Sequence, residues 1–184
     1  TFPLSFRVPG WCKTPEMSLN GTALSCAPDA KGFVRVERSW KSGDTVRLRF
    51  PMTPSVQTGN DRNADGAPYA TVSYGPLLFV LPIADTKNAN TPDPAAKWRY
   101  ALNAQNVRPS DITVERTAMP AQWDWPLASP LKLRLDAVAC DWTLDPKAPR
   151  LPAKPVAATG SAEKITLIPY GCAKFRISMF PVAK

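Results

Sequence analysis

The stretch GFVRVERSWKSGDTVRLRFPM, residues 32–52, decides the fold, because apolar and charged residues alternate in it twice, over 33–40 and over 46–50. A period of two places successive side chains on opposite faces of a strand. Lys-Ser-Gly-Asp at 41–44 has turn chemistry between the two runs. Pro51 ends the second run, because proline has no N–H for a ladder. The stretch predicts a β-hairpin, buried on one face and solvated on the other.

The composition extends this prediction to the whole chain of 184 residues, of which 44% are hydrophobic. That length allows one large or two small domains with a substantial core. The 21 prolines leave few windows for a long helix, since each costs about 3 kcal/mol in a helix interior. Short strand-like runs recur from residue 2 to residue 180. We therefore predict an all-β fold with little helix, an antiparallel β-sandwich or two joined sandwiches.

Composition also suggests where the chain divides. The segment DTKNANTPDPAA, residues 85–96, is typical of a linker. It separates a β-sandwich portion at 1–84, which contains the hairpin at 32–52, from a second β-rich portion at 97–184 that we expect to pack on the first. Asn20-Gly21 predicts a tight hairpin turn. The polar segment 57–68 is expected to be a loop.

Charge and motifs exclude several classes of function. The net charge is +8 without any histidine, but no two basic residues are adjacent, so the clustered stripe of a nucleic-acid-binding protein is missing. No apolar run has the length of a membrane span. Without histidine, Ser-His-Asp and Cys-His catalysis are excluded. We find no phosphate-binding loop and no dinucleotide fingerprint.

Four cysteines are present, and none of them has the C-x-x-C spacing of a zinc site: Cys12, Cys26, Cys140 and Cys172. Cys12 and Cys26 could form a disulfide across a short hairpin if the protein is exported. Buried free thiols explain the same residues equally well, because free cysteine packs as a small hydrophobe. The sequence leaves both alternatives open.

Asp61, Asn63 and Asp65 form a candidate calcium site, because they begin the pattern D-x-N-x-D-G of a calcium loop. Three side-chain oxygens at this spacing can converge on a hard cation. The twelfth position should hold a bidentate glutamate, and here it is Val72. A polar turn explains the segment without a metal, so we do not expect bound calcium.

An aromatic cluster is the candidate carbohydrate-binding site: Trp123, Asp124, Trp125 and Trp142. Indole faces pack on the apolar face of a sugar ring, and a nearby carboxylate accepts hydrogen bonds from its hydroxyl groups. Packing in a core or a domain interface is the alternative for these rings. The nearest candidates for the paired carboxylates of glycoside hydrolysis are Asp124, Asp136, Asp141 and Asp145. Surface charge is the simpler explanation for that group.

Several of these segments together resemble a known family. They are FPLSFRVPGW at 2–11, the Asn20-Gly21 turn, the stretch at 32–52, YGPLLFVLP at 74–82 and ITLIPYGCAKFRISMF at 165–180. In this order and spacing they resemble the C-terminal β-sandwich region of glycoside hydrolase family 127, the β-L-arabinofuranosidase family.

The resemblance implies that catalysis takes place outside this chain. In that family an upstream helical (α/α)₆ barrel holds a zinc ion on cysteines and a glutamate, and one cysteine is regarded as the nucleophile. The zinc ligands include adjacent cysteines. No cysteine of this chain matches that motif, so no catalytic residue is carried over. We expect no cofactor in this chain, with zinc confined to the catalytic domain of the parent protein.

The expected function is therefore that of a non-catalytic accessory β-sandwich region in a larger secreted or periplasmic glycoside hydrolase. It would support the catalytic barrel of the same polypeptide, and the chain would be a fragment of that protein. The alternative is a carbohydrate-binding module that holds a plant-type polysaccharide or glycan on exposed tryptophans. We expect no nucleic-acid partner.

Overall fold

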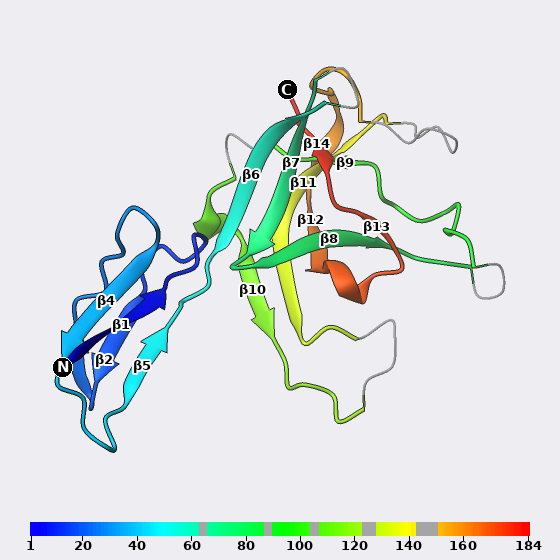
Figure 1. The fold of residues 1–184 in the computed structure, drawn as a ribbon. Helices are drawn as coiled ribbons and strands as arrows, with labels where there is room; N and C mark the ends of the chain where they lie inside the picture. The colour runs from blue at the N-terminus through cyan, green and yellow to red at the C-terminus, as the bar shows by residue number, and fades with distance from the viewer. Residues whose placement is uncertain (63–65, 87–89, 104–106, 123–127, 143–150) are drawn as a thin grey trace. The chain divides into compact units, whose positions relative to one another are not determined.

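A computed structural model describes residues 1–62, 66–86, 90–103, 107–122, 128–142 and 151–184. These residues form β-strands joined by turns and two short 3₁₀ segments (Figure 1), which confirms the all-β class. No helix of the described chain is long and apolar enough to cross a membrane. The chain divides into two compact units, Thr1–Thr53 and Pro54–Lys184.

The boundary between the two units, after Thr53, comes earlier in the chain than residues 85–96, which the composition predicts to be a linker. β8 (Leu77–Ile83) precedes residues 85–96, and β12 (Ala158–Pro169) and β13 (Phe175–Ile177) follow them. β8 pairs with both later strands. Residues 54–84 therefore belong to the same unit as the C-terminal half, because their backbone hydrogen bonds are made there.

The first unit is a small sandwich of two sheets. Its strands are β1 (Phe2–Arg7), β2 (Glu16–Leu19), β3 (Thr22–Leu24), β4 (Phe33–Arg38) and β5 (Val46–Arg49). One sheet pairs β1 with β4, and the other has the order β3-β2-β5. Val34 from the first sheet and Met17 from the second lie in one core with Val8 and Cys12. Side chains of both sheets thus pack face to face.

The hairpin predicted at 32–52 is wrong, although both of its strands exist. β4 pairs antiparallel with β1, and β5 pairs antiparallel with β2, so the two strands belong to different sheets. The 41–44 turn crosses from one sheet to the other. Alternation fixes which face of each strand is apolar, but it does not select the partner. Here each strand pairs with an earlier strand of the chain.

The Asn20-Gly21 turn is confirmed. It joins β2 to β3, and both residues have positive φ, 49° and 84°, as a type I′ turn requires. The Asn20 amide also holds the start of β5: its Oδ1 accepts a hydrogen bond from the Thr45 N–H at 2.9 Å, and its Nδ2 donates to the Asp44 carboxylate at 2.8 Å. The turn thereby fixes the register of the three-stranded sheet.

The second unit is one sheet of nine strands. Besides β8, β12 and β13, it contains β6 (Pro54–Asp61), β7 (Ala67–Tyr74), β9 (Tyr100–Ala101), β10 (Thr113–Arg116), β11 (Leu131–Cys140) and β14 (Phe180–Pro181). The main order is β10-β11-β12-β8-β7-β14, and β9 pairs with β11. The 3₁₀ segments are η1 (Pro109–Asp111) and η2 (Tyr170–Cys172).

The hydrogen-bonded path of this sheet closes back on β11. Leu102, directly after β9, donates its N–H to the Pro181 carbonyl and accepts from the Ala183 N–H, both at 3.0 Å. β14 is thus linked through Leu102 to β9, and β9 to β11. Fully buried side chains fill the interior, among them Phe79, Phe180, Leu133, Leu135 and Leu167.

β6 is a strand where the sequence predicts a polar loop over 57–68. It pairs with β7 along its whole length, and Gly59 lies opposite Tyr69. A Cβ at residue 59 would lie 2.6 Å from the Tyr69 hydroxyl oxygen. The Tyr69 ring therefore covers the glycine, and this cross-strand contact compensates for the low strand propensity of the Thr-Gly-Asn-Asp segment.

We predict that Gly59→Ala destabilises the second unit by about 1–2 kcal/mol, because the new methyl group displaces the Tyr69 ring. Thermal unfolding monitored by circular dichroism measures the effect. In a Tyr69→Ala background the same substitution should cost much less, since the clashing ring is gone. Equal costs in the two backgrounds would contradict the proposed contact.

Candidate functional site

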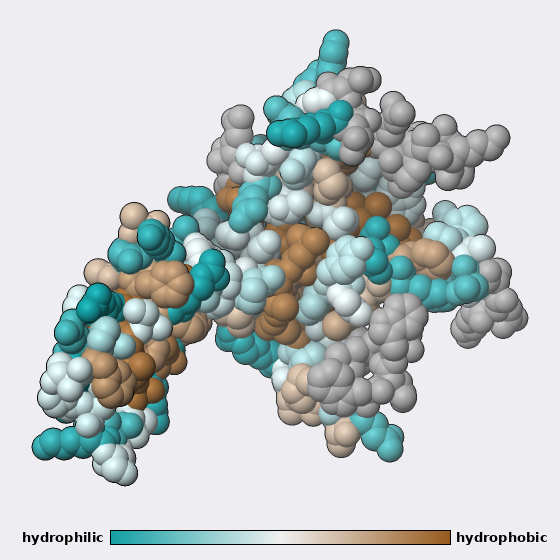
Figure 2. Space-filling model, in the orientation of Figure 1, coloured by the Kyte–Doolittle hydropathy of each residue, from teal (hydrophilic) through white to brown (hydrophobic). Residues whose placement is uncertain are grey.

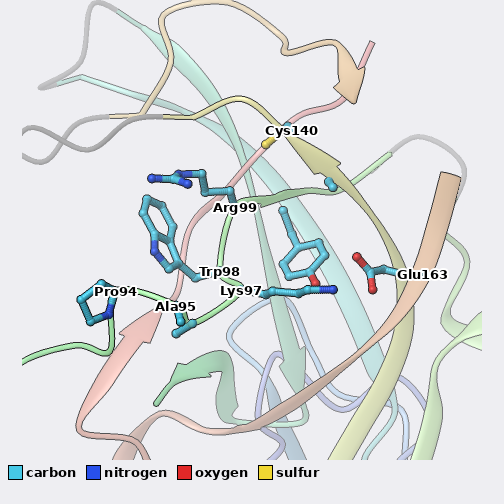
Figure 3. A pocket seen from close by; sticks show the side chains of 10 residues that line it. Pro94, Ala95, Lys97, Trp98, Arg99, Cys140 and Glu163 are labelled. Carbon is cyan, nitrogen blue, oxygen red and sulfur yellow. The ribbon is translucent and has the colours of Figure 1, made fainter. Parts of the chain in front are cut away.

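A cavity that polar side chains enter lies on the second unit, where residues 94–100 run beside β11 and β12. Its volume is about 380 Å³, within the range of roughly 300–1,000 Å³ typical of small-molecule sites. We call it the Trp98 pocket (Figure 3). Its lining residues are Pro94, Ala95, Ala96, Lys97, Trp98, Arg99, Tyr100, Ala139, Cys140 and Glu163.

The position of the pocket follows from strand pairing. Tyr100 of β9 lies opposite Ala139 of β11, and Glu163 of β12 lies opposite Ala137 of β11. Residues 137 and 139 of a strand share a face. The two side chains therefore approach each other across β11, over alanines too small to separate them.

The Glu163 carboxylate lies within reach of the Tyr100 phenol and acts on it as a hydrogen-bond acceptor and as a negative charge. Tyr100 is buried. Burial, with this hydrogen bond and the negative charge of Glu163 as further causes, raises the pKa of the Tyr100 phenol. At neutral pH the pair supplies a fixed hydroxyl group and a carboxylate that retains acceptor capacity on the solvent side.

Trp98 forms an apolar wall whose orientation is set by two neighbours. Its ring packs edge-on against Trp142, with centroids 5.5 Å apart and planes at 74°. The Arg99 guanidinium lies 4.9 Å from the Trp98 centroid, a cation–π distance. Figure 3 shows Trp98 between Pro94 and Arg99, with Lys97 extending toward Glu163.

Cys140 lines the pocket as a buried free thiol. Burial, and then the negative charge of Asp141, raise the pKa of the Cys140 thiol. Since the thiolate is the nucleophilic form, this environment does not activate the residue. Cys12, Cys26 and Cys172 are also free thiols. Cys26 packs against the core that contains Cys12.

The predicted sugar platform is divided by the structure. Trp123, Asp124 and Trp125 lie outside the described residues. Trp142 is 5% exposed and packs on Trp98, so it forms part of the wall behind the pocket. The sequence analysis did not select Trp98, Lys97 or Glu163. The basic and aromatic run at 97–100 was the available signal, but Glu163 is remote in sequence.

The other candidate residues are not gathered into one site within the described chain. Asn63, Asp65, Asp124 and Asp145 lie outside the described residues, and Asp61 ends β6. No group of three or more potential metal ligands occurs among the residues that the structure describes.

Asp136 lines a smaller cavity of about 240 Å³ together with Asp111. Both carboxylates are ion-paired: Asp136 lies 2.9 Å from the Lys164 ammonium, and Asp111 lies 3.4 Å from the Arg108 guanidinium. Hydrogen bonds from Arg108 lower the pKa of Asp111, the opposite of what a general acid requires.

The first unit exposes apolar side chains on β1. Phe2 is 51% and Leu4 is 38% exposed. Leu4 lies opposite Val36, which packs against the core, so Leu4 is on the core-facing side. Figure 2 shows hydrophobic surface on this unit beside hydrophilic areas. The β3-β2-β5 sheet therefore leaves one end of its partner sheet uncovered.

The fold places the chain among all-β proteins built from antiparallel sheets. Within that class, residues 1–52 match the family model for the middle domain of glycoside hydrolase family 127, the β-L-arabinofuranosidase family. This match confirms the family resemblance over the first unit, with the middle domain as the matched region. A search of curated proteins found no match to the sequence.

Solved structures extend the similarity in fold to the whole chain. A glycoside hydrolase is 24% identical with a TM-score of 0.61, and covers 100% of this chain and 28% of its own. The GH127 β-arabinofuranosidase BT3674 is 21% identical with a TM-score of 0.63, over 98% and 28%.

The GH127 β-L-arabinofuranosidase Ara127N-Se from Geobacillus stearothermophilus T6 is 22% identical with a TM-score of 0.55, over 98% of this chain and 26% of its own. The chain thus spans about a quarter of the length of these proteins.

We predict that the Tyr100 phenol ionises above its ordinary value of 10.0, and that Glu163→Gln lowers this pKa by removing the negative charge. Spectrophotometric titration measures the pKa, with Tyr100→Phe to assign the signal. Because the folded-state pKa is raised, stability is unaffected below pH 10 and is lost as the pH rises further. Identical titrations of the wild type and Glu163→Gln would contradict the contact.

Proposed function

We propose that this chain is a non-catalytic accessory β-sandwich region of a larger, secreted or periplasmic glycoside hydrolase related to β-L-arabinofuranosidases. The observation that carries the proposal is the match of residues 1–52 to the GH127 middle domain. The fold similarity over nearly the whole chain supports it, since the chain corresponds to only 26–28% of each similar hydrolase.

The apolar end of the first unit supports a packing role. Phe2 and Leu4 lie on β1. Among the described strands, β1 pairs only with β4, and β4 pairs only with β1. Exposed apolar residues beside unpaired strand edges favour contact with another protein surface. In our proposal that surface belongs to the upstream catalytic barrel of the same polypeptide, which would hold the zinc ion.

The position of Phe2 is well defined for such a contact. The Trp40 indole N–H donates to the Phe2 carbonyl at 2.9 Å, and the two rings lie 6.2 Å apart. The Arg38 guanidinium lies 5.6 Å from the Trp40 centroid. An apolar group held in place loses less conformational entropy on binding than a mobile one, so this end of the sheet is suited to an intramolecular interface.

The described carboxylates also favour a non-catalytic role. A glycosidase needs two carboxyl groups on either side of the scissile bond, one of them protonated. Asp111 and Asp136, which share a cavity, are each paired with a cation. Hydrogen bonds from Arg108 lower the pKa of Asp111, so this residue is not prepared to donate a proton.

The direct test is hydrolysis. We predict that the purified 184-residue chain releases no aglycone from aryl β-L-arabinofuranosides, with or without added zinc, in a spectrophotometric assay. A longer protein that contains the upstream domain serves as the positive control. Turnover that copurifies with the chain and is lost in Asp136→Asn would contradict the proposal.

A second prediction concerns the apolar end of β1. The chain alone should self-associate at high micromolar concentration, and Phe2→Ser combined with Leu4→Ser should shift it toward monomer in sedimentation velocity. Ser5→Ala is the matched control, because Ser5 lies on the opposite face of the same strand. A wild-type chain that stays monomeric, or equal association of all variants, would argue against an interface here.

A further inference from the structure

The Trp98 pocket contains hydrogen-bond donors and a hydrogen-bond acceptor that remain available to a ligand. Glu163 faces the Tyr100 phenol, and an ionised carboxylate has about four acceptor positions. Lys97 and Glu163 both line the pocket, and the Lys97 side chain extends toward Glu163 (Figure 3). A carboxylate and an ammonium group on one opening can bind adjacent hydroxyl groups, one as donor and the next as acceptor.

The pocket also provides apolar surface beside these groups. The Trp98 indole and the Pro94 ring line it together with short alanine side chains. Trp98 is fixed by Trp142 and Arg99 before any ligand arrives, so binding would not need to order it. The C–H groups of a sugar ring pack on surfaces of this kind, while its hydroxyl groups remain directed toward polar neighbours.

We propose that the Trp98 pocket is a binding site for a neutral sugar residue with two adjacent hydroxyl groups. One hydroxyl donates to Glu163 and its neighbour accepts from Lys97, while Trp98 contacts the C–H face of the ring. The inference rests on the proposed function for the source of the ligand, because a glycoside hydrolase works on chains of such residues. It assigns the ligand to residues other than the tryptophans selected from the sequence.

The acceptor in the pocket favours a neutral ligand over an acidic one. The Glu163 carboxylate needs a hydrogen-bond donor, which a sugar hydroxyl supplies and an ionised uronate carboxylate does not. The net charge of +8 would still attract acidic polysaccharides without a specific site. That attraction is screened by salt, whereas hydrogen bonds and ring contacts in a pocket are much less affected.

The experiment is isothermal titration calorimetry of the 184-residue chain at physiological ionic strength. The ligands are neutral arabinan and galactan oligosaccharides, with oligogalacturonate as the acidic comparison. We expect saturable binding of at least one neutral oligosaccharide. Lys97→Ala and Glu163→Gln should each weaken it about tenfold, the effect of losing one charge-assisted hydrogen bond.

Two controls separate the site from general effects. Arg35→Ala removes one exposed positive charge from the first unit, so it matches Lys97→Ala in charge and should leave the affinity unchanged. Thermal unfolding of each variant checks that the fold is retained. Lys97 and Glu163 are both exposed, and we expect small changes in the unfolding temperature.

The outcomes also separate this inference from the accessory role. The sugar site is overturned if no neutral oligosaccharide binds, if Lys97→Ala and Glu163→Gln bind as the wild type does, or if only oligogalacturonate binds and added salt abolishes the signal. None of these binding results bears on the prediction that the chain does not hydrolyse glycosides. Hydrolysis by the chain would overturn the accessory role and leave the binding data intact.

Discussion

The two backbone hydrogen bonds at Leu102 are the constraint on which the second unit depends. They connect the segment after β9 to the C-terminal residues Pro181 and Ala183, and Leu102 itself is fully buried. β9 has only two residues and one paired strand, β11, so it is too short to be stable alone. Held on both sides, it places Tyr100 in the interior and Trp98 and Lys97 at the surface just before it.

The first unit depends on a comparable constraint, because strands that are far apart in the sequence pair in each of its two sheets. β1 pairs with β4 and β2 with β5, so each sheet joins an early strand to a late one. The loop-closure entropy of such contacts must be offset by burial. The shared core, with Met17 and Val34 from opposite sheets, supplies that burial only when both sheets are formed.

The sequence predicted strands better than it predicted their partners. Alternation located β4 and β5 because side-chain periodicity is a local property, and Asn20-Gly21 located a turn because positive φ is also local. The hairpin was wrong because partner choice depends on β1 and β2. β6 was missed because Gly59 is stabilised by Tyr69 on the neighbouring strand, a contact that no window of the sequence contains.

The same distinction explains the candidate site. Tryptophans next to an aspartate suggested a sugar platform, but Trp142 is buried behind Trp98. Exposure is a tertiary property, and an aromatic residue gives the same sequence signal on a surface and in a core. The sequence does not link Glu163 to Tyr100, because their proximity depends on strand pairing. β12 and β9 both pair with β11, and they do so two residues apart, at Ala137 and Ala139.

The two proposed surfaces differ in chemistry, and this difference argues for separate roles. The exposed end of β1 presents Phe2 and Leu4 beside unpaired backbone, which suits a dry and extended protein contact. The Trp98 pocket combines one aromatic wall with a carboxylate and an ammonium group, which suits a small polar ligand that exchanges with water. A protein interface over the pocket would have to bury Lys97 and Glu163, at the cost of desolvating both charges.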